Sequence, residues 1–86
     1  MKPWELVLSE QAFRAVLALK PSERQKLIRT MEAIANDPMR EPAARFTTAE
    51  GRRASVVFTD RHAIAYWLDP WAVEVRVVDL KPINRG

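Results

Sequence analysis

The sequence predicts an α+β domain in which two helices cover a three-stranded antiparallel meander. Residues 54–80 contain three short apolar runs, ASVVFT, HAIAYWL and AVEVRVVDL, separated by Thr59-Asp60-Arg61 and by Asp69-Pro70-Trp71. The runs are rich in β-branched and aromatic residues, and the breaks hold turn formers, which is typical of consecutive strands. Because the breaks are too short to contain a helix, we expect neighbouring strands to pair antiparallel.

Length and residue usage exclude several classes of protein. A chain of 86 residues suits a single domain, 1-86, with one hydrophobic core. It has no cysteine and one histidine, which excludes disulfides, thiolate metal sites and histidine-rich metal cages, and we expect no cofactor. No apolar run approaches the roughly 20 residues of a membrane span, and the N-terminus lacks a signal-peptide pattern. We therefore expect a soluble cytoplasmic protein. Its net charge of +3 permits an anionic or acidic partner without requiring one.

The N-terminal segment predicts one strand followed by one helix. The strand covers residues 4–8, with Trp4, Leu6 and Leu8 facing inward, but the pattern does not determine where this strand joins the sheet. Ser9 is a suitable N-cap, and Pro21 ends the helix that follows. The helix has an apolar stripe formed by Phe13, Val16 and Leu17.

A second helix is predicted from Ser22 to the stop at Asn36-Asp37-Pro38. Ser22 and Gln25 have the spacing of a capping box. The short connection between the helices predicts an antiparallel hairpin. The core stripe of the second helix comprises Leu27, Ile28, Met31, Ile34 and Ala35, and its solvated face includes Arg24, Lys26 and Arg29.

Two further segments carry weaker patterns. Residues 39–53 form a polar, arginine-containing connection in which a strand can begin near Phe46 and in which Gly51 marks a turn. The tail from about residue 81 has no pattern and is expected to fray. Trp71, after Pro70, is either an exposed contact residue or packs back on the sheet edge.

Strand parity divides the meander into two faces, since residues two apart share a face. The first set is apolar apart from a tyrosine and is expected to lie under the helices: Val56, Phe58, Ile64, Tyr66, Leu68, Val73, Val75 and Val77. The second set combines arginines with small residues and one tryptophan on the opposite face: Arg53, Ser55, Val57, Arg61, Ala63, Ala65, Trp67, Glu74, Arg76 and Val78.

The second set suggests a binding face. Arginine binds phosphate or carboxylate through two parallel hydrogen bonds, and tryptophan stacks on bases or fills a pocket in a partner. An alternative is a solvated face with scattered ion pairs, such as Glu74 with Arg53 or Arg61. A further alternative for Trp67 is packing against a second copy in a homodimer.

The order of these elements resembles the RelE/ParE superfamily of type II toxin–antitoxin toxins. The similar pieces are WELVLSEQAFRAVLAL, AIANDP, GRR, RHAIAYWLD and VEVRVVDL, and they are distributed over nearly the whole chain. The resemblance implies one of two activities. RelE-like members enter the ribosome and cut mRNA, whereas ParE-like members inhibit DNA gyrase without nuclease activity. It also implies a cognate antitoxin that wraps the helices and sheet, in a toxin–antitoxin hetero-oligomer.

The nuclease positions of the family are only partly matched. RelE-like nucleases carry lysines and arginines on the middle strands, and an arginine and a tyrosine near the C-terminus. The paired lysines fall at Ala54 and Val56, and the strand arginine three residues before Tyr66 falls at Ala63. The C-terminal tyrosine is absent, because Tyr66 is the single tyrosine and lies in a strand.

The remaining candidates for chemistry are few. Metal-free RNA cleavage needs proton carriers and cations around the phosphate. His62 can carry a proton near neutral pH, and the candidate catalytic set is His62, Arg61 and Arg76. Residues expected to bind nucleic acid or a partner are Arg53, Arg61, Trp67, Arg76 and Lys81. Parity points His62 away from the arginine face, where it can equally be a strand-end residue.

These observations predict the toxin of a type II toxin–antitoxin system that inhibits translation by ribosome-dependent mRNA cleavage through a basic sheet face. The alternatives are a non-enzymatic, ParE-like gyrase inhibitor and a degenerate, non-toxic partner-binding member. The sequence does not choose between the ribosome and gyrase as the target.

Overall fold

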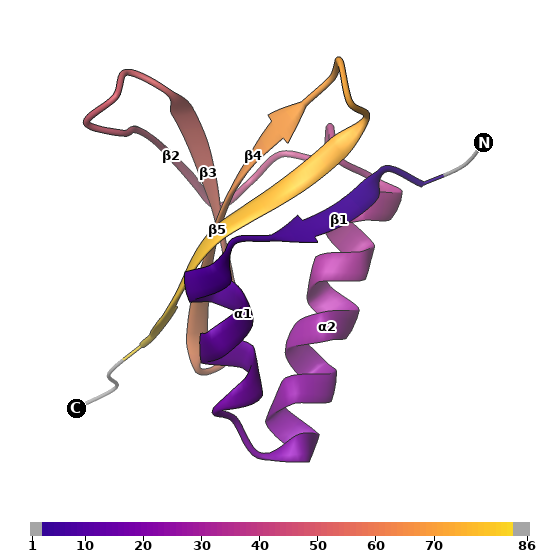
Figure 1. Ribbon diagram of the computed structural model, residues 1–86, viewed down its shortest axis with the longest axis vertical. Helices are drawn as coiled ribbons and strands as arrows, with labels where there is room; N and C mark the ends of the chain where they lie inside the picture. The colour runs from indigo at the N-terminus through magenta and orange to yellow at the C-terminus, as the bar shows by residue number, and fades with distance from the viewer. Residues whose placement is uncertain (1–2, 84–86) are drawn as a thin grey trace.

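A computed structural model describes residues 3–83 and contains two helices and one five-stranded sheet (Figure 1). The predicted α+β arrangement of strand, helix hairpin and meander is confirmed. The elements, in chain order, are β1 (Glu5–Leu8), α1 (Glu10–Leu17), α2 (Pro21–Asn36), β2 (Ala44–Thr47), β3 (Arg53–Phe58), β4 (His62–Asp69) and β5 (Glu74–Pro82).

The sheet has the strand order β1-β5-β4-β3-β2. β1 pairs parallel with β5, with Leu6 opposite Val75. The α1–α2 hairpin and the strands β2 to β4 lie between them in the chain and provide the long connection that parallel pairing requires. β5, β4 and β3 form the predicted antiparallel meander. β2 corresponds to the strand that the sequence analysis allowed near Phe46. It pairs with β3 and forms the other edge of the sheet.

The start of α1 follows the sequence prediction. The Ser9 hydroxyl accepts a hydrogen bond from the Ala12 N–H at 3.0 Å, as an N-cap should. The guanidinium of Arg24 on α2 donates to the Val16 and Leu17 carbonyls at the end of α1, and to the Leu19 carbonyl beyond it, at 3.1–3.3 Å. Arg24 therefore closes the helix hairpin and is not part of a merely solvated face.

The start of α2 differs from the prediction. Pro21 is the first helical residue and Lys20 is the N-cap, with no side-chain hydrogen bond at the cap. Proline suits this position because its fixed φ is already helical and its missing N–H needs no partner. Pro21 thus begins α2, the capping box of Ser22 and Gln25 is not formed, and the predicted stop after Asn36 is confirmed.

The core lies between the helices and one side of the sheet. Its buried apolar residues are Ala12 and Val16 from α1, Leu27, Met31, Ile34 and Ala35 from α2, and Ile64, Tyr66, Val75, Val77 and Leu80 from the sheet. Trp4, Leu6 and Leu8 pack against this core, as predicted. The predicted stripe of α1 is only partly right, because Phe13 and Leu17 are half-exposed while Ala12 is fully buried.

The parity predicted for β3 is wrong. Val57 lies opposite Ile64 and Ser55 lies opposite Tyr66, so these β3 residues face the helices. Val56 and Phe58 face the other way, and Phe58 is half-exposed. The turn after Phe58 sets this register, and a shift of one residue moves every side chain to the opposite face. Val56 and Val57 are adjacent and equally apolar, so the sequence pattern did not show which of them faces the core.

A bulge keeps β5 in contact with the core along its length. Ala65 pairs with Asp79 whereas Tyr66 pairs with Val77, which leaves Val78 as the extra residue. Val77 and Leu80 consequently both face the core. The strand continues through Lys81 to Pro82, so the fraying expected from residue 81 is wrong for these residues; residues 84–86 lie outside the described part of the chain.

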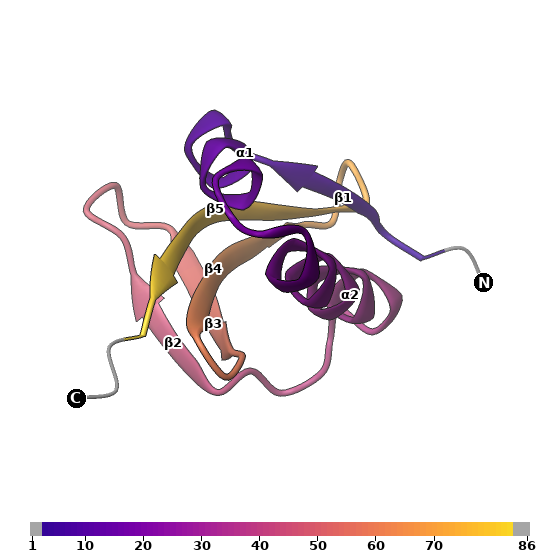
Figure 2. The ribbon, with the colours of Figure 1, turned by 90° about the horizontal axis from the view of Figure 1, so that it is seen from below.

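The sheet curves around α2, which lies on its concave side (Figure 2). α1 and α2 contact β1 and β5, whereas β2 and β3 extend beyond the helices. We call the side toward α2 the helix side and the opposite side the open face. Neither helix in residues 3–83 is long and apolar enough to cross a membrane.

Candidate functional site

The open face is apolar at its centre and charged at its ends. Strand register places small and apolar side chains in the middle of this face: Phe46, Ala54, Val56, Ala63 and Ala65. Phe58, at the end of β3, also reaches the hollow beside His62. Its charged residues gather at the end where β4 meets β5, and around Lys81 at the other end. This differs from the arginine-rich face predicted from parity, because the β3 register moved Val56 and Phe58 onto it.

One end of the open face carries a cation–π stack around Trp67. The Arg52 guanidinium lies 3.9 Å from the centre of the Trp67 ring, and that of Arg76 lies 5.4 Å from it. Arg76 also donates to Glu74 at 2.9 Å and lies 3.8 Å from Asp69. The stack orients the indole, and the two carboxylates neutralise Arg76, which reduces its availability to a phosphate.

An apolar hollow of about 370 Å³ occupies the middle of this face. We call it the open-face hollow; it is lined by Phe46, Thr48, Val56, Ala63, Ala65, Val78, Asp79 and Lys81. Lys81 lies 3.8 Å from Asp79, and the Asp79 carboxylate accepts hydrogen bonds from the Gln11 amide and the Leu80 N–H. The hollow is thus suited to an apolar side chain, and Lys81, the cation at its border, is paired with Asp79.

A second hollow, of about 540 Å³, lies on the helix side beside His62. We call it the His62 hollow. α2 contributes Lys26 and Arg29 to its wall, and the β3–β4 turn contributes Arg61. His62 is buried at the start of β4, and Arg61 lies 3.6 Å from Glu23 of α2. The hollow brings a histidine and three cations together with the carboxylates of Glu23 and Asp60, so only part of its positive charge is available to an anion.

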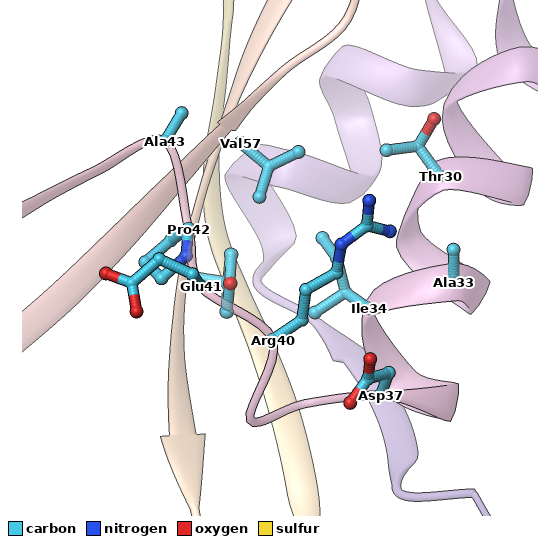
Figure 3. A pocket seen from close by; sticks show the side chains of 10 residues that line it. Thr30, Ala33, Ile34, Asp37, Arg40, Glu41, Pro42, Ala43 and Val57 are labelled. Carbon is cyan, nitrogen blue, oxygen red and sulfur yellow. The ribbon is translucent and has the colours of Figure 1, made fainter.

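A third hollow, of about 320 Å³, lies beside Tyr66 between α2, the 37–43 connection and β3 (Figure 3). We call it the Tyr66 hollow; Ala33, Ile34, Pro42, Ala43 and Val57 form its apolar wall. Burial raises the pKa of Tyr66 above its ordinary value of 10.0, and a hydrogen bond with Ser55 and the charge of Arg45 offset part of that rise. A neutral hydroxyl and a nearby guanidinium therefore border this hollow.

The structure separates the predicted site residues. Trp67 and Arg76 share the open face, and Lys81 lies at its far end. Arg61 pairs with α2 on the helix side, so the prediction that it shares a face with Arg76 is wrong. Arg53 has the parity of Ser55 and also belongs to the helix side. His62 lies away from Arg76, as parity predicted, but next to Arg61.

Three arginines that border these sites were not predicted from the sequence. Arg52, and not Arg53, stacks on Trp67, and only the strand register distinguishes these neighbours. Arg40 lines the Tyr66 hollow and Arg45 influences Tyr66 from β2. The sequence showed only that the 39–53 connection is rich in arginine. Because this connection has no regular alternation of apolar and polar residues, the direction of its side chains was not predictable.

Comparisons with known proteins identify the fold. The RelBE2 toxin–antitoxin complex of Mycobacterium tuberculosis contains a chain with 14% identity and a TM-score of 0.77, with 96% of this chain and 94% of that chain covered. The archaeal RelE–RelB complex of Pyrococcus horikoshii OT3 gives 10% identity and a TM-score of 0.78, with coverages of 99% and 100%. The isolated E. coli RelE toxin has 16% identity and a TM-score of 0.77, with 96% of this chain and 87% of that chain covered.

This chain has the RelE-like fold. No family model matches the sequence, and no curated protein matches it either. At 10–16% identity the solved structures establish a shared backbone fold. The chemistry of the site depends on the residues of this chain.

Proposed function

We propose that this chain is the toxin of a type II toxin–antitoxin pair, that a cognate antitoxin holds it silent in the cytoplasm, and that it inhibits a protein target by binding it through the open face. DNA gyrase, the target of the ParE-like branch, is a protein of the kind expected. The RelE-like fold supports a role in a toxin–antitoxin pair, since the RelE structures above come from such systems.

The composition of the open face is the observation that carries the choice of binding over cleavage. The positions at which the family resemblance expects nuclease cations hold Ala54, Val56 and Ala63. Of the cations that lie on this face, Arg76 and Lys81 each lie beside a carboxylate, and Arg52 stacks on Trp67. Phosphoryl chemistry needs unpaired positive charge around the reacting phosphate, whereas a protein interface needs an apolar centre with polar borders.

Inducible expression without antitoxin tests this proposal, with protein synthesis and DNA replication measured separately. We expect early replication arrest with a DNA-damage response, while mRNA stays intact. Ala65→Glu places a charged side chain in the open-face hollow and should abolish growth inhibition. Ala49→Glu, in the exposed β2–β3 connection, is the matched control and should inhibit like the parent. Normal growth at verified expression of the folded parent would contradict the proposal.

Ribosome-dependent mRNA cleavage is the second candidate, and the His62 hollow favours it. His62 is the one histidine of the chain, and Lys26, Arg29 and Arg61 lie around the same hollow. A histidine beside several cations has the groups that metal-free cleavage requires. In this candidate His62 carries the proton and Arg61 contacts the phosphate.

Two single substitutions separate the candidates, because Arg61 and Arg76 lie on opposite sides of the sheet. Loss of growth inhibition with Arg76→Ala alone supports the open face. Loss with Arg61→Ala alone, together with cleaved mRNA in a purified ribosome assay, supports the His62 hollow. Thermal melts of both variants establish that the fold is intact.

A further inference from the structure

The β4–β5 turn carries the most exposed large apolar side chain in the described part of the chain. Trp71 is 96% exposed, and neighbouring Val73 is half-exposed. Figure 1 shows this turn projecting past the same end of the sheet as the β2–β3 connection. A tryptophan in a folded protein normally buries most of its ring. Trp71 therefore contributes almost no packing to the fold that carries it.

The turn that presents Trp71 is held by hydrogen bonds on both sides. The Asp69 carboxylate accepts a hydrogen bond from the Ala72 N–H at 3.2 Å. The Val73 carbonyl accepts one from the Glu5 N–H at 2.9 Å, which fastens the turn to β1. Val73 keeps a φ of 56°, a conformation that costs energy for a β-branched residue and persists only where its surroundings enforce it. The exposed ring thus projects from a turn that is already ordered.

The turn continues the charged end of the open face. Trp67 and Asp69 are two residues apart on β4 and share that face, and Trp71 follows two residues later. The Arg52 guanidinium, 3.9 Å from the centre of the Trp67 ring, holds this indole against the sheet. One end of the open face consequently carries a tryptophan that lies on the sheet and a second tryptophan that projects beyond it.

We propose that Trp71 is the anchor of the open face, and that its ring inserts into an apolar pocket on the surface of the protein target. This inference rests on the proposed function and adds the side chain on which the affinity for the target depends most. Tryptophan is enriched among the few residues that dominate the energy of protein interfaces. An ordered turn also loses little conformational entropy on binding. Trp71 therefore needs no rearrangement of the chain before it binds.

The charges around the turn favour a protein pocket over a nucleic acid. Asp69 and Glu74 are the strand residues at the base of the turn, where one guanidinium faces both carboxylates. That guanidinium belongs to Arg76, 3.8 Å from Asp69 and 2.9 Å from Glu74. A base stacked on Trp71 would bring its phosphates toward these carboxylates, whereas single-strand sites place positive charge around their aromatic rings. An anionic membrane surface would meet the same repulsion.

Substitution of Trp71 in the inducible expression experiment tests the anchor. Trp71→Ala should raise the amount of protein needed for half-maximal growth inhibition by at least about tenfold, as expected of a dominant interface residue. Trp71→Gln keeps a long side chain but not the ring and should lose as much. Trp71→Phe retains an aromatic ring and should lose only about threefold.

Phe13→Ala is the matched control, because Phe13 is a half-exposed aromatic residue on α1, away from the open face. It should inhibit growth like the parent. Immunoblots measure the amount of each variant in the cell. Trp71→Ala should melt within about 4 °C of the parent, since the ring makes little packing contact. A larger fall in melting temperature would assign Trp71 a structural role and overturn the proposal.

The outcomes distinguish this inference from the proposed function. Full inhibition by Trp71→Ala, while Ala65→Glu is inactive, would overturn the anchor and leave the proposed function standing. Normal growth at verified expression of the folded parent would overturn both. Cleavage of mRNA by the parent but not by Trp71→Ala would show that the ring stacks on RNA. Sedimentation of the parent, but not of Trp71→Ala, with phosphatidylglycerol vesicles would show a membrane contact, and either result would overturn the anchor.

Discussion

The two sides of the sheet use the same kind of residue in opposite ways. On the open face, Arg76 lies between carboxylates and Arg52 stacks on Trp67, so these guanidinium groups are held by other side chains. On the helix side, Arg40 lines the Tyr66 hollow and Arg53 lies further along β3, and neither pairs with a carboxylate within residues 3–83. Arg52 and Arg53 are consecutive in the chain and belong to different surfaces. Position in the sheet, and not the number of arginines, determines where a surface is available to an anion.

The first way to test this comparison is to truncate a large apolar residue on each side. Ile64 is fully buried under the helices, whereas Phe58 on the open face is half-exposed. Ile64→Ala should lower the free energy of unfolding by about 2–5 kcal/mol, because it leaves a cavity in the core. Phe58→Ala should cost less than about 1 kcal/mol, since little packing is lost.

Urea unfolding of both variants followed by circular dichroism measures this difference. A cost for Phe58→Ala equal to that of Ile64→Ala would mean that Phe58 belongs to a core, and the assignment of the open face would be wrong. A small loss of unfolding free energy for both variants would mean that Ile64 is not part of the core on the helix side.

The pH dependence of stability tests the burial of Tyr66 on the helix side. Burial raises the pKa of Tyr66 above 10.0, so the folded protein holds the phenolic proton more tightly than the unfolded chain does. The contribution of this group is therefore fully present below about pH 10 and is lost as pH rises through the folded pKa. Tyr66→Phe should change stability by only about 1 kcal/mol near pH 7 and should flatten the decline above pH 10.

Denaturant midpoints of the parent and of Tyr66→Phe between neutral and alkaline pH measure this effect. Parallel declines of the two proteins above pH 10 would be inconsistent with a raised pKa. The Tyr66 hydroxyl would then not be held in its neutral form by burial at the border of the Tyr66 hollow.

The smallest expected effect concerns the β4–β5 turn, at the charged end of the open face. Val73 has a φ of 56°, which is unfavourable for a β-branched residue. Parity predicted it to be buried, yet it is half-exposed, and neighbouring Trp71 is 96% exposed. The Val73 carbonyl accepts a hydrogen bond from the Glu5 N–H at 2.9 Å, which holds the turn against β1.

Val73→Asn should raise the free energy of unfolding by about 0.5–1 kcal/mol, because asparagine tolerates a positive φ and valine does not. Thermal melting measures the gain. Destabilisation by asparagine would show that the Val73 side chain contributes packing that exceeds the strain of its backbone.

Much of the fold was predictable because it depends on local patterns. Ser9 caps α1 through its own hydroxyl, and Asn36 ends α2 before Asp37-Pro38, as expected from nearest neighbours in the chain. The three strands of the meander lie within a residue or two of the predicted runs. The inward set of β4, Ile64, Tyr66 and Leu68, was also correct, since Ala63 and Ala65 alternate with its first members.

The surfaces were less predictable because they depend on pairing between segments. The turn at Thr59-Asp60-Arg61 set the β3 register, placed Val57 inward and carried Arg53 to the helix side. Arg61 turned toward Glu23, a residue far from it in the chain. No periodicity within β3 contains this information, because a register is a relation between two strands.

The amino-acid sequence by itself therefore determined the elements, their order and the apolar layer between helices and sheet, because spacing, caps and turn residues act over a few positions. The tertiary structure decided which face each β3 side chain joined, where β1 paired, and which arginines were left without a carboxylate. Those outcomes follow from the curvature of the sheet around α2 and from registers that bring distant residues together.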